Sequence, residues 1–173
     1  MTDLLQYGVY GDLNGHAIGI VMKELVRRAL NKAREQRFLF TATAKETPGK
    51  DEDFFTTADT AAQELYVRSL HECFPTFGIL AEEQNLCVRP SNPTPNLRFS
   101  VDPIDGTKAY MRRQSHGIGT MLALAQYDEV IGAIVGDIMT QEIYGFRPGS
   151  TKVHRISEFD HPETLVIDPR RSL

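Results

Sequence analysis

The sequence predicts an α+β domain in which two helices pack on a mainly antiparallel sheet. Two segments with the apolar periodicity of helices occupy the first half of the chain, and short apolar segments divided by turns occupy the second half. This order is typical of helices layered on one face of a single sheet. The 173 residues, 41% hydrophobic and 24% charged, have an ordinary globular composition and can bury a core.

The first helix is predicted by a stripe of apolar residues at steps of three and four, and either Asp12 or Asn14 is suited to cap it. The stripe comprises Ile18, Met22, Leu25, Ala29 and Ala33. After this helix, the charged residues 45–53 contain Pro48 and Gly49 and predict a loop.

A second helix is predicted after this loop. Thr56 or Thr57 can cap it, and Pro75 ends it. Its inner stripe comprises Ala58, Ala62, Leu65, Tyr66, Ser69, Leu70 and Cys73. On this face Cys73 is most simply a small core residue. Asp59 falls in the first turn, where an acidic residue complements the helix dipole.

The rest of the chain predicts strands. Residues 77–80 and 97–101 are short apolar segments that run into acidic residues, and the proline-rich residues 88–96 between them predict a loop. Three later segments rich in Val, Ile, Ala and Leu are separated by short turns and predict an antiparallel meander. These segments are 118–125, 130–137 and 142–147.

The hexapeptide DPIDGT follows the predicted strand 97–101 and contains two carboxylates, Asp102 and Asp105. Its proline fixes φ and Gly106 permits a positive φ, so the chain can turn tightly there. Such a turn can aim both carboxylates and the Ile104 carbonyl at one point, as a hard cation such as Mg²⁺ requires. A plain turn with solvated acids is the alternative.

Two further acidic features favour the metal site. Glu82 and Glu83 follow the segment 77–80, and if this strand pairs near 97–101, they leave the sheet at the same edge as Asp102. Adjacent carboxylates at a strand end repel one another unless a cation or water screens them. With Asp59, the chain has three acidic clusters at the ends of apolar elements, and together they predict a carboxylate-rich metal site.

Three motifs resemble, in order and spacing, those of the inositol monophosphatase-like phosphatases, a group that includes histidinol-phosphate phosphatases and bisphosphate nucleotidases. The motifs are TTAD at 56–59, FGILAEE at 77–83 and DPIDGT at 102–107. The resemblance implies the N-terminal half of a layered α/β/α/β/α sugar-phosphatase fold. It also implies a magnesium-dependent, lithium-sensitive phosphomonoesterase that hydrolyses a small phosphorylated alcohol, either inositol monophosphate or histidinol phosphate, with Mn²⁺ as the alternative metal.

The resemblance further implies a role for individual residues. The implied metal ligands are the carboxylates of Glu82, Asp102 and Asp105 and the carbonyl oxygen of Ile104. The implied catalytic residues are Asp59 and Thr107, which orient the attacking water, and Glu83, which tunes Glu82. The implied phosphate-binding groups are the backbone N–H groups of Gly106 and Thr107 and the side chain of Lys45. For Lys45, a solvated loop lysine is the alternative.

The sequence departs from the family pattern in two places. It contains no tryptophan, so it lacks the W-D-x-x-A motif whose aspartate completes the family's metal site. Lys108 stands where inositol-type members have asparagine, and a basic residue there is closer to the histidinol-phosphate and bisphosphate-nucleotide branches. We therefore expect an N-terminal metal-binding domain over residues 1–160 and the start of a second, otherwise absent domain over 161–173. A non-catalytic metal- or phosphate-binding module that acts through association is the alternative function.

Charge and composition limit the classes of partner and the cellular compartment that the sequence favours. The net charge of −4 argues against a nucleic-acid polymer as partner, and no apolar run approaches the ~20 residues of a membrane span. The chain begins with acidic Asp3 rather than a basic secretory segment, and its two cysteines are too few for a disulfide framework, so we expect a cytoplasmic protein. The family resemblance implies a small phosphate monoester as ligand. The apolar residues 165–167 form a candidate edge strand that predicts a homo-oligomer.

Overall fold

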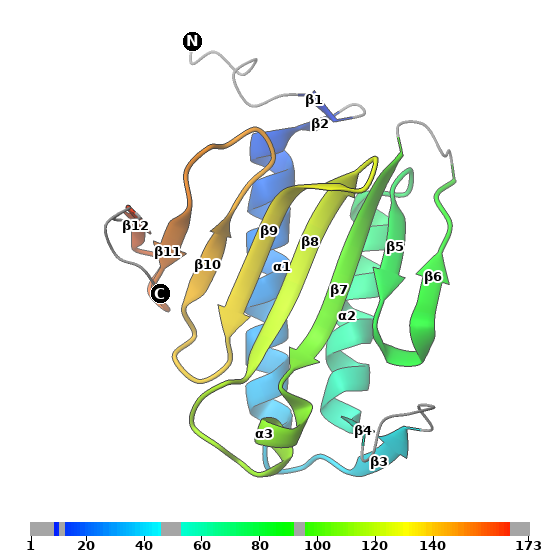
Figure 1. Ribbon diagram of the computed structural model, residues 1–173, viewed down its shortest axis with the longest axis vertical. Coiled ribbons are helices and arrows are strands. Elements are labelled where there is room, and N and C mark those ends of the chain that lie inside the picture. The colour runs from blue at the N-terminus through cyan, green and yellow to red at the C-terminus, as the bar shows by residue number, and fades with distance from the viewer. Residues whose placement is uncertain (1–8, 11–12, 46–52, 92–95, 167–173) are drawn as a thin grey trace.

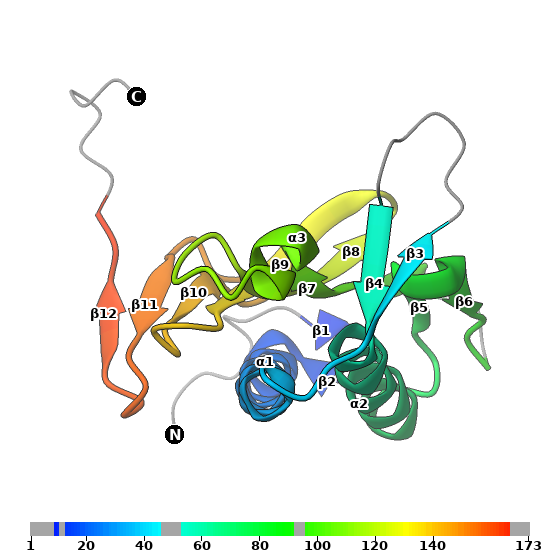
Figure 2. The ribbon, with the colours of Figure 1, turned by 90° about the horizontal axis from the view of Figure 1, so that it is seen from below.

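The computed structural model describes residues 9–10, 13–45, 53–91 and 96–166. Its centre is an eight-stranded sheet with the strand order β12-β11-β10-β9-β8-β7-β5-β6. Helices α1 and α2 lie side by side on one face of this sheet (Figure 1, Figure 2). Strands β5 and β7 run parallel, and every other pair of neighbours in the sheet is antiparallel. The predicted fold class is therefore confirmed.

The helices and strands follow one another along the chain in the order of their labels. The helices are α1 (Gly15–Gln36), α2 (Thr57–Cys73), α3 (Thr107–Met111) and a 3-10 turn, η2 (Glu83–Asn85). The strands of the large sheet are β5 (Gly78–Ala81), β6 (Leu86–Val88), β7 (Leu97–Asp105), β8 (Gly119–Gln126), β9 (Glu129–Asp137), β10 (Ile143–Phe146), β11 (His154–Ile156) and β12 (Pro162–Thr164). Two small sheets are formed by β1 (Val9–Tyr10) with β2 (Leu13–Asn14) and by β3 (Ala42–Lys45) with β4 (Asp53–Thr56).

Both long helices begin at a predicted cap. The side chain of Asn14 accepts a hydrogen bond from the Ala17 N–H at 2.9 Å, and all five residues of the predicted α1 stripe are buried. Thr56 caps α2 and forms a reciprocal capping box with Asp59. The helices therefore start where side-chain oxygens satisfy the free N–H groups of the first turn.

The end of α2 differs from the prediction at Cys73. This residue is exposed rather than part of the core. Phe74 follows it with a non-helical backbone and turns inward, where its ring lies 5.1–5.3 Å from those of Phe77 and Phe99. The aromatic cluster takes the place that helical periodicity had assigned to the cysteine.

The predicted loop 45–53 begins and ends in strands. Lys45 and Asp53 pair as the last residues of the β3–β4 hairpin, and residues 46–52 between them lie outside the described residues. The sequence pattern did not indicate this hairpin because its strands are only four residues long and β3 is largely exposed. The hairpin is hydrogen-bonded to the start of α2 through the Thr57 N–H, which donates to the Thr41 carbonyl at 3.0 Å.

The predicted meander is confirmed as β8, β9 and β10, but β7 is longer than predicted. It continues through Pro103 to Asp105, with a register shift against β8 between Asp102 and Asp105. A proline cannot donate to a strand ladder, and an irregularity of this kind accommodates it within a central strand.

At the C-terminal end, β12 pairs with β11 and extends the same sheet. Residues 162–164 are thus in the large sheet, and the division into two domains near residue 160 stays a prediction. The strand expected at 165–167 is not formed at Leu165 and Val166, and Ile167 lies outside the described residues. No helix in the described ranges is both long and apolar enough to span a membrane.

Helix α1 packs closely against the sheet at Gly136 in β9. A Cβ atom at this position would lie 2.8 Å from side-chain atoms of Leu30 and Val26, both of which are fully buried. The same construction at Gly78, in β5, gives an ordinary contact of 3.4 Å with Arg98. The absence of a side chain at Gly136 therefore allows α1 to pack on β9.

We expect Gly136→Ala to destabilise the fold by about 1–3 kcal/mol, because the added methyl group overpacks the contact between α1 and β9. Urea unfolding followed by circular dichroism measures the change in the free energy of unfolding. Gly78→Ala is the matched strand control and should cost much less. Equal losses in the two variants would show that the close approach at Gly136 does not limit packing.

Candidate active site

The parallel pairing of β5 with β7 brings two of the acidic motifs together. Ala81 pairs with Val101, and the N–H of Glu82 donates to the Val101 carbonyl at 3.1 Å, so Glu82, directly after β5, lies beside Asp102 in β7. An open pocket of about 270 Å³ lies at this edge. Its lining residues are Phe54, Glu82, Asp102, Ile104, Asp105, Gly106, Thr107 and Lys108. The predicted convergence of the acidic motifs is therefore present in the structure.

The third motif reaches the site through Asp59, which is buried at the start of α2. One carboxylate oxygen accepts a hydrogen bond from the Thr56 N–H at 2.7 Å, and the other lies 3.3 Å from the Thr107 hydroxyl. That hydroxyl is also 3.0 Å from the Ile104 carbonyl. Burial raises the pKa of Asp59 above its ordinary value, although the hydrogen bonds from Thr56 oppose the shift.

Gly106 turns the chain from β7 into α3. Its φ is +80°, and a Cβ atom there would lie 2.2 Å from the Gly117 carbonyl oxygen, so only glycine fits. The short helix that follows is held by Tyr110, whose hydroxyl donates to the Ala33 carbonyl in α1 at 2.6 Å. These contacts fix the backbone that presents Thr107 to the pocket.

Glu83 is buried beneath the site rather than lining its pocket. Gln63 in α2 holds its backbone at both ends: the side-chain oxygen accepts from the Glu83 N–H at 2.9 Å, and the side-chain nitrogen donates to the Glu83 carbonyl at 3.0 Å. Burial raises the pKa of the Glu83 carboxyl above its ordinary value, and hydrogen bonding to Lys45 opposes this shift.

Lys45 crosses from β3 to the acidic residues and is not a solvated loop lysine. Its Nζ lies 3.1 Å from Glu82 Oε1 and 2.9 Å from Glu83 Oε1, and its side chain is only 18% exposed. Burial by itself would lower the pKa of the ammonium group, but the hydrogen bonds to Glu83 and Glu82 outweigh it and raise this pKa. Its predicted contact with phosphate stays a prediction.

Asp102 is the most perturbed carboxylate of the site. Burial, followed by the nearby charge of Glu82 and then of Asp105, raises its pKa to about 7. Its Oδ1 is buried and accepts no hydrogen bond from the part of the chain that the structure describes. A cation would satisfy this oxygen and remove the repulsion. In the same part of the chain, no three Asp, Glu, His or Cys side chains are already arranged around a metal position.

The donor set fits a hard cation, although the ligands are not preformed around one. Glu82, Asp102 and Asp105 supply carboxylate oxygens and Ile104 supplies a carbonyl oxygen at one pocket. These are the ligand types that Mg²⁺ and Mn²⁺ take, with water completing the shell. Asp105 is exposed, so its side chain is free to adjust.

Comparison with known proteins decides between a chance turn and a family motif. The sequence profile of the inositol monophosphatase family matches residues 16–155, a range that includes all three acidic motifs. The chain belongs to this family.

Relatives show how much of a family member this chain represents. Nus factor SuhB of Xylella fastidiosa is 28% identical over 101 residues, which are 58% of this chain and 34% of the relative. Inositol-1-monophosphatase of Rhizobium meliloti is 30% identical over 92 residues, which are 53% of this chain and 33% of the relative. The matched segment therefore spans about a third of the length of these curated family members.

Solved structures of the family share the fold. The inositol monophosphatase of Thermotoga maritima has a TM-score of 0.70 at 20% identity, over 91% of this chain and 56% of its own. An inositol monophosphatase/NADP phosphatase complexed with Mg²⁺ and phosphate has a TM-score of 0.61 at 19% identity, over 86% of this chain and 51% of its own. This chain thus spans about half of these family members.

Three residues in or beside this pocket were not predicted. Gln63 lies one helical turn after Asp59 on the buried face of α2, and a polar residue in an apolar stripe is a signal that could have marked it. Phe54 was missed with the hairpin. Thr120 is buried in β8, where its hydroxyl is 2.9 Å from the hydroxyl of Tyr66 and 3.4 Å from the Asp102 carbonyl. No sequence signal distinguishes it from other strand threonines.

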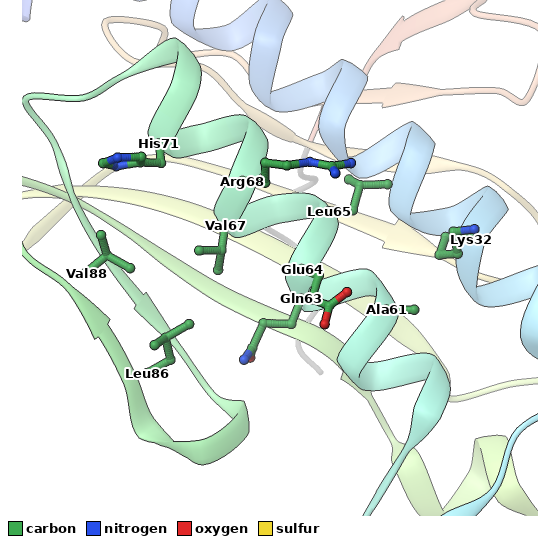
Figure 3. A pocket seen from close by; sticks show the side chains of 10 residues that line it. All are labelled: Lys32, Ala61, Gln63, Glu64, Leu65, Val67, Arg68, His71, Leu86 and Val88. Atoms are coloured by element: carbon green, nitrogen blue, oxygen red, sulfur yellow. The ribbon is translucent and has the colours of Figure 1, made fainter.

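A second cavity of about 660 Å³ lies along α2, toward α1 on one side and β6 on the other (Figure 3). Apolar side chains such as Val67, Leu86 and Val88 line it together with the cations Lys32 and Arg68. Glu64 is the one carboxylate among its lining residues. Despite its size, this cavity lacks the clustered oxygen donors of the smaller pocket, and we place the active site in the latter.

The raised pKa of Asp102 makes the stability of the metal-free chain dependent on pH. The folded chain holds the proton of this carboxyl more tightly than the unfolded chain, so stability falls as pH rises from about 4 to about 7. We expect Asp102→Asn to be more stable than wild type at pH 8, by on the order of 1–2 kcal/mol after allowance for solvent screening. The advantage should shrink toward pH 4.

Thermal unfolding with a chelator, between pH 4 and pH 8, measures this difference. Asp128→Asn is the matched control, because Asp128 is exposed at the turn between β8 and β9 and is paired with Arg98. Its effect should be small throughout. A pH-independent effect of Asp102→Asn would show that burial and the neighbouring carboxylates do not raise the pKa of Asp102.

Proposed function

We propose that this chain is the metal- and phosphate-binding part of a magnesium-dependent, lithium-sensitive phosphomonoesterase that hydrolyses a small phosphorylated alcohol. The observation that carries the proposal is the shared contact of the Thr107 hydroxyl. This hydroxyl lies within hydrogen-bonding distance of both Asp59 and the Ile104 carbonyl, and the same pocket is lined by Asp102. A proton acceptor, a hydroxyl and the oxygen donors for a metal are therefore connected in one site.

Four residues would hold the metal ion: Glu82, Asp102, Asp105 and, through its carbonyl oxygen, Ile104. The choice of Mg²⁺, with Mn²⁺ as the alternative, is supported by the hard oxygen donors, by the unpartnered Asp102 oxygen and by the relative that is complexed with Mg²⁺ and phosphate. When bound, Mg²⁺ lowers the pKa of water and neutralises charge on a transferring phosphoryl group.

The chain's own residues orient the reactants and move the proton. Thr107 can accept a hydrogen bond from the attacking water while its own hydrogen passes to Asp59, whose raised pKa makes it a better proton acceptor. The backbone N–H groups of Gly106 and Thr107 would bind phosphate oxygens at the turn that the positive φ of Gly106 forms. Glu83 would support Glu82 through their common partner Lys45.

Inositol monophosphate and histidinol phosphate are the proposed substrates, and Lys108 on the pocket lining would meet the alcohol portion. We propose no nucleic-acid polymer or membrane as partner, in keeping with the net charge of −4, and we propose the cytoplasm as compartment. A homo-oligomer is proposed because helices α1 and α2 cover only one face of the sheet (Figure 2). In β9, Val135 alternates with buried Ile134 and is 37% exposed on the opposite face.

A second candidate function is a non-catalytic module that binds metal or phosphate and acts through association. The relative from Xylella fastidiosa, which bears the name Nus factor SuhB, favours keeping it. The two functions differ in one measurable respect, because only the phosphatase releases inorganic phosphate from an ester.

We expect the chain with Mg²⁺ to release phosphate from inositol monophosphate or histidinol phosphate, and Li⁺ to inhibit it. The rate should be low, since a metal site without the family's last aspartate stabilises less transition-state charge. Asp102→Asn should reduce the remaining rate at least ~100-fold, which corresponds to about 2.7 kcal/mol of transition-state stabilisation. Colorimetric phosphate release measures it.

Asp128→Asn again serves as the control and should retain the wild-type rate. Full activity in Asp102→Asn would contradict the assigned roles. Binding of Mn²⁺ and phosphate without any phosphate release would instead favour the non-catalytic module.

A further inference from the structure

Five carboxylates gather at the ends of β5, β7 and α2, and one lysine neutralises part of their charge. Within the described residues, Lys45 is the cation that lies within 4.0 Å of any of them, at 3.1 Å from Glu82 and 2.9 Å from Glu83. The remaining carboxylates are those of Asp59, Asp102 and Asp105. The ammonium group thus contacts one of the two carboxylate oxygens of Glu82, a proposed metal ligand of the pocket.

The contact spans separate parts of the fold. Lys45 belongs to the two-stranded sheet β3-β4, which forms no strand pairing with the eight-stranded sheet among the described residues. Glu82 directly follows β5 of that larger sheet. The hairpin lies beyond the end of the large sheet, below β5 and β7 in the view of Figure 1. An ion pair between two separately held elements can break without disrupting a ladder of backbone hydrogen bonds, at the cost of one partly exposed pair.

We infer that Lys45 is an internal cation that competes with the divalent metal ion for Glu82, so that it sets how tightly the site binds metal. The inference rests on the proposed function, because it takes Glu82 as a metal ligand. In the metal-free chain, Lys45 screens the repulsion between Glu82 and Glu83. A divalent ion in the pocket would take the place of the ammonium group at Glu82, and Lys45 would then keep only its contact with Glu83.

Competition with the metal ion and a purely structural role of the Lys45–Glu82 ion pair predict different metal affinities. If Lys45 only fastened β3 to the core, its removal would loosen the hairpin and leave the metal affinity unchanged or reduced. If it competes, removal of the ammonium group frees Glu82 and strengthens metal binding. The two roles therefore move the affinity in opposite directions.

The test is calorimetric titration of the 173-residue chain and its variants with Mn²⁺. Lys45→Met keeps the length of the side chain and removes the charge, and we expect it to bind Mn²⁺ about tenfold more tightly than wild type. Lys45→Arg keeps a cation beside the glutamates and should bind no more tightly than wild type. Lys108→Met is the matched control. It removes a positive charge from the same pocket, but Lys108 has no ion pair with these glutamates among the described residues, so the gain should be at most about threefold.

A second measurement follows the hairpin itself. Amide hydrogen exchange of residues 42–45 in wild type should accelerate when Mn²⁺ or Mg²⁺ is added, because β3 loses one of its contacts. Equal or weaker metal binding by Lys45→Met, or an equal gain in Lys108→Met, would overturn the inference and leave the proposed function standing. If wild type, Lys45→Met and Asp102→Asn all fail to bind Mn²⁺ at millimolar concentration, the proposed metal site falls and the inference falls with it.

Discussion

The parallel pairing of β5 with β7 is the constraint on which the active site depends. The pairing register places Ala81 beside Val101, and each of these residues is followed in the chain by an acidic residue, Glu82 or Asp102. A shift of this register by one residue would move Glu82 along β7, out of its place beside Asp102. Parallel pairing also requires a connection across the sheet. Here the connection is the β6 hairpin and residues 89–96, which explains why residues some twenty positions apart in sequence meet at one edge.

Packing elsewhere in the fold maintains that edge against electrostatic repulsion. Helix α2 contributes Gln63, which holds the backbone of Glu83 at both ends, and Asp59, which reaches Thr107. Helix α1 contributes the Ala33 carbonyl that anchors Tyr110, and thereby α3. Hydrogen bonds from neutral groups and the ammonium group of Lys45 thus offset part of the electrostatic repulsion between the clustered carboxylates. These contacts leave Asp102 as the carboxylate whose charge is least compensated, in keeping with its pKa of about 7.

Sequence reasoning succeeded where one local rule determined the structure. The stripe of α1, the threonine cap of α2 and the meander follow from periodicity and turn chemistry, and the structure confirms them. It failed where a tertiary contact overrode the local rule. Cys73 is exposed because Phe74, and not the cysteine, packs into the core beside Phe99. The continuation of β7 through Pro103 requires a register shift against β8, and no local sequence pattern predicts it. Lys45 fitted a solvated loop equally well, because its partners Glu82 and Glu83 are distant in sequence, the nearer one by 37 residues.

The Asp59 carboxylate makes two separate interactions, one with each of its oxygens. One of its oxygens closes the capping box that begins α2, and the other faces Thr107 in the pocket. The stability of α2 and the proposed chemistry therefore depend on the same carboxylate, so a substitution at Asp59 would affect both. A lineage that abandoned catalysis would still be held to an acid or a close substitute at this position by the helix alone. The persistence of Asp59 in a distant relative would consequently say little about whether that relative is an enzyme, whereas Thr107, which caps nothing, would be the more informative residue.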